Sequence, residues 1–185
     1  RSHLETILEA ARRLSHVPNI VFLMVGDGAE RQVLVQMRNA MGLQNVMMLD
    51  QQPKSRMPDF WALSAVSLVL LKKSDLFKTV IPSKMFESLA MAKPIVLGVE
   101  GESAELLQVA QAGLWIEPED VDQLVARVLA LSNDRELCQR LGRNGRRFVM
   151  EHFDRIVLAR KLVSVIERVC GRSPVQAPEL SIPAR

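Results

Sequence analysis

The sequence predicts an α/β fold built around a parallel sheet. Short, continuous apolar runs recur along the chain, as in parallel strands buried on both faces, and turn residues bound them. Longer segments with apolar residues at helical spacing lie between these runs. With 185 residues and 48% hydrophobic content, the chain can form one domain with a sizeable core. We therefore expect a three-layer domain with helices on both faces of the sheet.

Strands and helices are expected to alternate along the chain. The apolar runs predict strands at residues 19–25, 45–49, 66–71, 95–97 and 114–116. Helical periodicity predicts helices at residues 2–14, 33–41, 57–64, 83–93, 104–112, 121–131, 135–150 and 153–170. A doubly wound domain normally begins with a strand, but this chain opens on a helix. The sheet is therefore expected to show an exposed edge or a gap where a first strand belongs.

Residues 79–99, TVIPSKMFESLAMAKPIVLGV, are the segment around which the other elements are arranged. Pro82 and Ser83 predict a helix start, because proline is tolerated where backbone N–H groups are unpaired and serine can cap them. Such a helix start presents free N–H groups and a partial positive charge to an anion. Glu87 lies one turn further, about 6 Å from Ser83 along the axis. This spacing suits a diphosphate and its adjoining ribose.

Two loops that follow predicted strands extend this candidate site. Gly26 and Gly28 form a glycine-rich turn, which either lets the backbone approach a phosphate or nucleoside or merely reverses the chain. The loop at residues 72–81 lies at the carboxyl end of the predicted central strand, where open parallel sheets bind ligands. It is polar and net basic, which suits a diphosphate, although a charged loop is often only solvated. Its charged and hydroxyl side chains are those of Lys72, Lys73, Asp75, Lys78 and Thr79.

The segment PSKMFESLAMAKPIV resembles the signature of the retaining GT-B glycosyltransferases of the group 1, or family 4, type. Among these it looks most like the bacterial hexosamine transferases of O-antigen and capsule assembly. The resemblance runs from about residue 2 to residue 170. It implies that residues 1–170 form the Rossmann-like, donor-binding half of a GT-B fold without its first strand. The acceptor-binding N-terminal domain would lie outside this chain, and the proline-dotted residues 171–185 are expected to form a flexible tail.

The resemblance also assigns roles to residues of the central segment. Glu87 matches the glutamate that holds the ribose hydroxyls of a nucleotide-sugar donor. The helix start at Pro82, with Ser83 and Lys84, matches the segment whose amides bind the diphosphate. Thr79 stands where the family often has a second glutamate near the donor sugar, so we expect it to face the sugar without supplying charge.

A further loop, at residues 50–56, corresponds to the family's frame for the nucleotide base. It contains Pro53 and Lys54, and it would act largely through backbone atoms. The alternative is a solvated turn whose lysine contacts nothing.

The complete enzyme that the resemblance implies would transfer a sugar from a nucleotide-sugar, UDP-linked hexosamine by expectation, to a lipid-linked or glycan acceptor. Anomeric configuration would be retained, and neither a metal nor another cofactor would be needed. The sequence reveals no catalytic nucleophile or general base, so this domain alone should bind donor weakly and catalyse nothing. Two other functions remain open at this point. One is a GT-B fold nucleotide-sugar epimerase, and the other is a non-catalytic nucleotide-binding Rossmann-like module.

Composition narrows the function classes further. Cys138 and Cys170 lack paired-motif or metal-ligand spacing, which predicts reduced thiols in a cytoplasmic protein. The three histidines form no metal motif. No apolar run reaches the ~18 residues of a membrane span, and a net charge of +3 gives little support to nucleic-acid binding. A basic cluster could still contact the inner face of the cell membrane. The arginines that could do so, or could simply be solvated, are Arg140, Arg143, Arg146 and Arg147.

Overall fold

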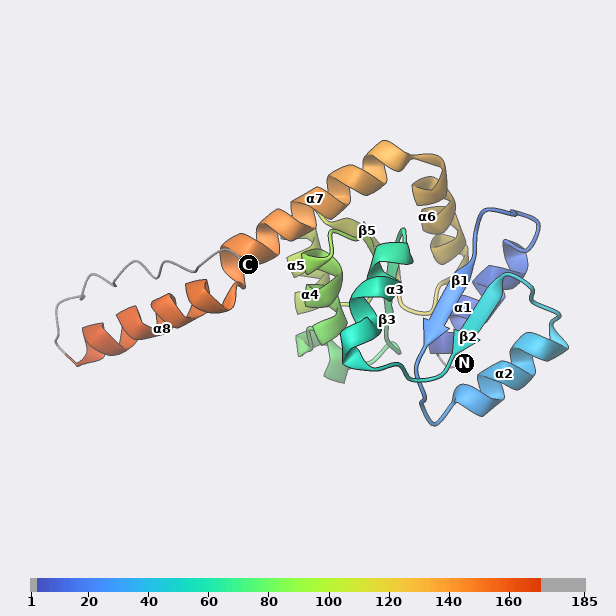
Figure 1. Ribbon diagram of the computed structural model, residues 1–185, viewed down its shortest axis with the longest axis horizontal. Coiled ribbons are helices and arrows are strands. Elements are labelled where there is room, and N and C mark those ends of the chain that lie inside the picture. The colour runs from blue at the N-terminus through green and yellow to red at the C-terminus, as the bar shows by residue number, and fades with distance from the viewer. Residues whose placement is uncertain (1–2, 171–185) are drawn as a thin grey trace. The chain divides into compact units, whose positions relative to one another are not determined.

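The computed structural model describes residues 3–170, which form eight helices, two short 3-10 helices and five strands (Figure 1). The chain divides into two compact units, Arg1–Val149 and Met150–Arg185. All five strands belong to the first unit, and α8 belongs to the second. The predicted flexible tail, residues 171–185, lies outside the described residues.

The observed elements follow the predicted order. The first half of the chain forms α1 (His3–Arg13), β1 (Phe22–Val25), α2 (Arg31–Ala40), β2 (Val46–Leu49), η1 (Lys54–Arg56), α3 (Met57–Leu63) and β3 (Ser67–Leu70). The second half forms η2 (Asp75–Thr79), α4 (Ser83–Ala90), β4 (Ile95–Gly98), α5 (Glu102–Ala110), β5 (Gly113–Trp115), α6 (Val121–Asn133), α7 (Arg135–His152) and α8 (Arg155–Val169). The α/β fold with parallel strands is confirmed.

The five strands form two separate parallel sheets rather than one. β1 pairs with β2, with Phe22 opposite Val46, and β3, β4 and β5 form the other sheet in that order. The two sheets nevertheless share one core. Its buried residues come from α1, α2 and α6 and from strands of both sheets. The expected gap in the sheet is therefore present, inside a single compact unit.

Helices cover both faces of the three-stranded sheet. Successive strand residues point to opposite faces, and Val96 of β4 belongs to the core shared with α1 and α6, whereas its neighbours Ile95 and Leu97 do not. On that second face α4 packs against β3 and β4. A hydrogen bond of 2.7 Å between the buried hydroxyls of Ser88 and Ser67 joins α4 to β3. This half of the unit has the three layers that the sequence predicts.

The two-stranded sheet is covered on one face only. Phe22 of β1 and Val46 of β2 are buried in the shared core. The opposite face is open, since Val21 is 56%, Leu23 36% and Met47 51% exposed. The expectation that residues 19–25 are buried on both faces is therefore wrong. The apolar run cannot reveal this, because α1 and α2 both pack on the same core and leave the other face uncovered.

α4 and α7 approach each other closely through glycines. Gly142 and Gly145 are both buried in α7. A methyl group at position 142 would overlap the main-chain oxygen of Ala92, at the end of the α4 turn, and one at position 145 would overlap the side chain of Leu89. The two glycines therefore set how closely α7 lies against α4.

The second unit contains α8, which begins after Asp154. The Asp154 side chain accepts a hydrogen bond from the N–H of Ile156 and so caps the helix. Throughout the part of the chain that the structure describes, no helix has both the length and the apolarity that a membrane crossing requires.

Candidate functional site

The carboxyl ends of β3, β4 and β5 lie at one edge of their sheet, because the strands are parallel. The loops at this edge hold one another through hydrogen bonds. The indole Nε1 of Trp115 donates to the carbonyl of Val99 at 3.0 Å, and the Ser103 hydroxyl donates to the carbonyl of Val80 at 2.7 Å. The loop that leads into α4 is therefore fixed against α5.

The start of α4 follows the loop at this edge, and its first residues, Ser83 and Lys84, are exposed. Pro82 is the N-cap residue, and no side chain of a described residue caps the helix. The expectation that Ser83 caps the helix is wrong, because Ser83 is its first helical residue. Met85 is the first residue whose N–H is bonded back, to the carbonyl of Pro82 at 2.9 Å. The amides before it are those that a helix leaves for an external acceptor.

The predicted residues of the central segment are exposed and close in sequence. Thr79 ends η2, and Ser83, Lys84 and Glu87 are exposed on α4. Ser83 and Glu87 are four residues apart on one helix, so their side chains share a face. Met85, Ser88 and Leu89 on the opposite side are buried and hold the helix in place. Thr79 is not buried under the sheet, and its predicted contact with the donor sugar stays a prediction.

Two lysines of the basic loop are already paired. Lys73 forms an ion pair with Glu117, which follows β5, and this hydrogen bond raises the pKa of the lysine. Lys78 lies 2.7 Å from Asp75, and their hydrogen bond raises the pKa of Lys78 and lowers that of Asp75. These pairs leave less positive charge for a diphosphate than the sequence pattern suggests.

Two other lysines near the start of α4 are not neutralised by a described acidic residue. Lys72 and Lys84 are both exposed, and neither forms an ion pair with a described residue. Lys84 lies beside the open amides at the start of α4, so it is the cation best placed to attract an anion there.

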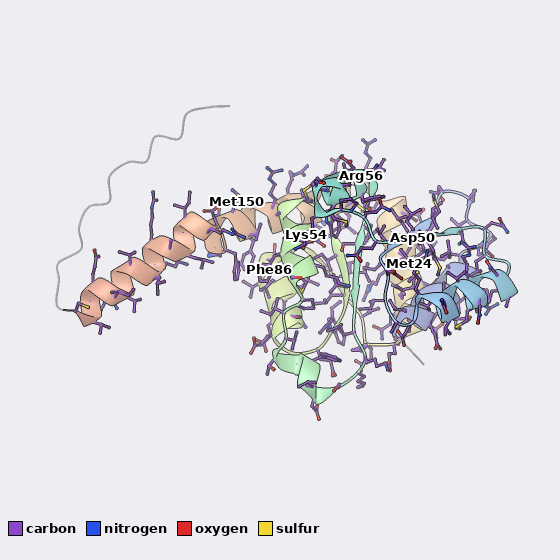
Figure 2. All side chains as sticks on the ribbon, turned by 60° about the horizontal axis from the view of Figure 1, so that its bottom comes forward. Met24, Asp50, Lys54, Arg56, Phe86 and Met150 are labelled. Carbon is purple, nitrogen blue, oxygen red and sulfur yellow. The ribbon has the colours of Figure 1, made fainter. Side chains whose placement is uncertain are left out.

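The other predicted residues lie in the segments that follow β1 and β2. Gly26 follows β1, where its φ of 147° favours glycine, and Gly28 lies two residues further. Pro53 and Lys54 are exposed in the segment after β2, and Lys54 is labelled in Figure 2. An ion pair between Arg31, at the start of α2, and Asp50, just after β2, joins these two loops. Neither this pair nor the partner of Lys73 is expected from the sequence, although Asp50 and Glu117 are charged residues that closely follow strands.

The predicted residues therefore follow strands of both sheets. The helix-start residues and Thr79 follow β3, whereas the glycine turn follows β1 and the loop with Lys54 follows β2. A surface hollow of about 470 Å³ lies elsewhere, along the outer edge of β2 and the end of α2, and none of the predicted residues lines it. Within residues 3–170, no three His, Cys, Asp or Glu side chains gather as metal ligands would.

Comparison with known proteins decides the family. The sequence profile of the family described as "Glycosyl transferases group 1" matches residues 1–148. This chain is a group 1 glycosyl transferase domain. Its sequence is also similar to WcaI of Escherichia coli strain K12, named for colanic acid biosynthesis, with 31% identity over 129 residues. That match covers 68% of this chain but 31% of WcaI, so the chain matches about a third of this relative's length.

Solved structures share the fold of this group 1 domain. Sucrose-phosphate synthase from Thermosynechococcus elongatus matches 94% of this chain with a TM-score of 0.75 at 20% identity, over 43% of its own length. TarM from S. aureus, solved with fondaparinux, α-GlcNAc-glycerol and UDP, matches 88% of this chain with a TM-score of 0.74 at 15% identity, over 32% of its length. The chain therefore has the Rossmann-like fold of one half of a GT-B glycosyltransferase.

Proposed function

We propose that this group 1 domain is the donor-binding half of a glycosyltransferase that takes its sugar from a nucleotide-sugar. One observation carries the proposal. The start of α4 is an uncapped helix N-terminus at the carboxyl edge of a parallel sheet, and the exposed Glu87 shares a face with Ser83 one turn away. Amides that bind an anion and a carboxylate that accepts hydroxyl hydrogen bonds are the two features that a sugar diphosphate needs.

Each residue of the site has a role in this proposal. The amides of Ser83 and Lys84, with the positive end of α4, bind the diphosphate and stabilise it as it leaves, so no metal is required. Glu87 binds the ribose hydroxyls, and Thr79 faces the donor sugar. The residues that follow β1 and β2 would frame the base through the backbone: Gly26, Gly28, Pro53 and Lys54.

The donor in this proposal is a UDP-linked hexosamine, transferred with retention to a lipid-linked or glycan acceptor of the cell envelope. TarM, a structural relative, was solved with UDP and α-GlcNAc-glycerol, and the name of WcaI refers to colanic acid biosynthesis. A domain outside this chain would bind the acceptor, so the chain alone would bind donor weakly and catalyse nothing. Exposed arginines of α7 would meet anionic headgroups near a lipid-linked acceptor: Arg140, Arg143, Arg146 and Arg147.

Membership of the group 1 family favours a transferase over an epimerase or a non-catalytic nucleotide-binding module. The test of the donor site is calorimetric titration of UDP into the 185-residue chain and into its Glu87→Ala variant. A charged hydrogen bond contributes roughly 1.5–3 kcal/mol, so the loss of Glu87 should weaken binding about ten-fold or more. Glu87 is exposed, so the melting temperature should stay within a few degrees of the parent value.

A matched control is Glu136→Ala, because Glu136 is also an exposed helix acid but lies on α7. This control should leave UDP affinity unchanged. Equal affinities for the parent and Glu87→Ala at equal stability would contradict the ribose assignment.

A further inference from the structure

The start of α5 holds the loop that precedes α4 at two points. Gly101 is the N-cap residue of α5, with a φ of 72°, and a methyl group there would overlap the main-chain carbonyl of Lys78. Two residues further, the fully buried Ser103 donates its hydroxyl hydrogen to the carbonyl of Val80 at 2.7 Å. The first contact requires glycine at position 101, and the second requires a hydrogen-bond donor at position 103.

Thr79 lies between the two held carbonyls. It is the last residue of η2, and it is exposed. The N–H of Val80 bonds back to the carbonyl of Phe77 at 3.3 Å, which closes η2 directly after Thr79. The main chain on both sides of Thr79 is therefore fixed, while Thr79 itself remains exposed.

A short and stiff stretch joins Val80 to α4. Val80 is extended, with φ −103° and ψ 128°, and so is Pro82, with φ −62° and ψ 135°. The proline ring fixes the φ of Pro82, and it also restricts the conformation of Ile81 before it. No side chain of a described residue caps α4. The position of the first amides of α4 therefore depends on where the carbonyl of Val80 is held.

The later part of α4 is held from another side. Met85 and Leu89 are buried. Glu87 lies between these two residues in the sequence, so its position depends on their packing rather than on α5. Loss of the contacts with α5 should therefore displace the amides of Ser83 and Lys84 and leave Glu87 in place.

We propose that Gly101 and Ser103 are positioning residues of the donor site, which place Thr79 and the first amides of α4 where a sugar diphosphate binds. Neither residue touches the ligand, because both act through the main chain of the loop. The inference rests on the proposed function, since it concerns the same site. A ligand binds more tightly when the groups that contact it already have their bound geometry. Gly101 and Ser103 therefore set the affinity for the diphosphate and not for the nucleoside.

The test separates these two parts of the ligand by comparing UDP with uridine, which lacks the diphosphate. Dissociation constants for both are measured by NMR titration of the ¹⁵N-labelled 185-residue chain and of three variants. Ser103→Ala removes the hydrogen bond to Val80, and Gly101→Ala forces the loop away from α5. The matched control is Gly113→Ala, because a methyl group there would overlap the carbonyl of Ile95 at the amino end of the same sheet.

The parent chain should bind UDP more tightly than uridine. Ser103→Ala and Gly101→Ala should each weaken UDP binding about five-fold or more, the effect of one lost hydrogen bond, and change uridine binding by less than about two-fold. The amide of Ser83 should shift in both variants without ligand, whereas that of Glu87 should not. Gly113→Ala should be less stable than the parent and yet keep the parent's ratio of UDP to uridine affinity.

Two results would overturn this inference and leave the donor site intact. One is a Ser103→Ala variant that keeps the parent's ratio of UDP to uridine affinity. The other is a Gly113→Ala control that lowers this ratio as much as Ser103→Ala does, which would show that any loss of stability weakens diphosphate binding. Equal affinities of the parent for UDP and uridine would instead overturn the donor-site proposal, and this inference with it.

Discussion

The two sheets of this domain differ in how helices cover them. All four residues of β4 are buried, because α6 packs on one face of its sheet and α4 on the other. In the two-stranded sheet, by contrast, Val21 and Met47 remain half exposed on a face that no core covers. The residues that carry the proposed diphosphate and ribose contacts all lie on the better-covered half.

The three-stranded half is the part of the domain in which a ligand site is held in place most firmly. α4 is fixed by the hydrogen bond between Ser88 and Ser67 and by the close approach of α7 at Gly142. Beside the two-stranded sheet, the side-chain amide of Asn45, just before β2, donates to the carbonyl of Ala11 in α1 at 2.8 Å. We therefore expect substitutions in the three-stranded half to affect both stability and the site, and equivalent changes in the two-stranded half to cost less.

Shortening a buried side chain of β4 should produce the largest effect. Leu97 has no exposed surface, so Leu97→Ala should lower the free energy of unfolding by about 2–5 kcal/mol, through lost burial and the cavity left behind. Met47→Ala on the open face of β2 should cost under about 1 kcal/mol. Urea unfolding followed by circular dichroism measures both values. Equal losses for the two variants would show that the sheets are equally covered.

A methyl group added where α7 contacts the segment after α4 should lower the free energy of unfolding. Gly142→Ala forces α7 away from the main chain of Ala92 and should cost roughly 1–3 kcal/mol as an overpacking change. Arg143→Ala, at the exposed neighbouring position, is the control and should change stability by about 0.5 kcal/mol or less. Thermal melts compare the two variants, and equal melting temperatures would contradict a close contact at Gly142.

The hydroxyls of Ser67 and Ser88 beneath α4 are hydrogen-bonded, so their contributions to stability should depend on each other. Ser88→Ala leaves the buried Ser67 hydroxyl without its partner and should cost about 1–2 kcal/mol. Replacing both serines by alanine should cost less than the sum of the two single changes, because no hydroxyl is then left unpaired. A double-mutant cycle by urea unfolding tests this, and strictly additive losses would rule out the coupling.

The smallest effect concerns α1, the helix that joins the two halves. The hydrogen bond from Arg12, helped by Arg13, lowers the pKa of Glu9 from 4.5 to about 2. A lowered carboxyl pKa stabilises the fold above pH 4.5, and this contribution disappears as the pH falls through 2. Glu9→Gln should therefore cost under about 1 kcal/mol at pH 7 and nothing near pH 2. The free energy of unfolding of the parent and of Glu9→Gln should be measured at several pH values. The difference between the two proteins should shrink as the pH falls, and a difference independent of pH would contradict the ion pair.

Local patterns in the sequence were sufficient to predict the order of helices and strands. Apolar runs and helical spacing depend on neighbouring residues, so the buried strand β4 and the capped start of α6 at Asp120 follow directly from them. The apolar run at residues 19–25 could not show that helices cover only one face of β1, because coverage depends on where α1 and α2 pack.

In the candidate site, too, the sequence predicted only the features that neighbouring residues determine. The helix start and the exposure of Glu87 follow from Pro82 and the spacing of the segment, both of which are local. The ion pair between Lys73 and Glu117 joins residues 44 positions apart, and the pair between Arg31 and Asp50 joins two different loops. Charge pairing of this kind requires the fold, so the basic character of the loop after β3 was overestimated from the sequence.

We expect the start of α4 to bind the nucleotide of a donor. A titration of the ¹⁵N-labelled chain with UDP, followed amide by amide, tests this binding site. The amides of Ser83, Lys84 and Glu87 should shift in proportion to saturation, and those lining the hollow beside β2, such as Arg38 and Leu43, should not. Shifts confined to the residues of that hollow, with the start of α4 unmoved at saturation, would contradict this binding site.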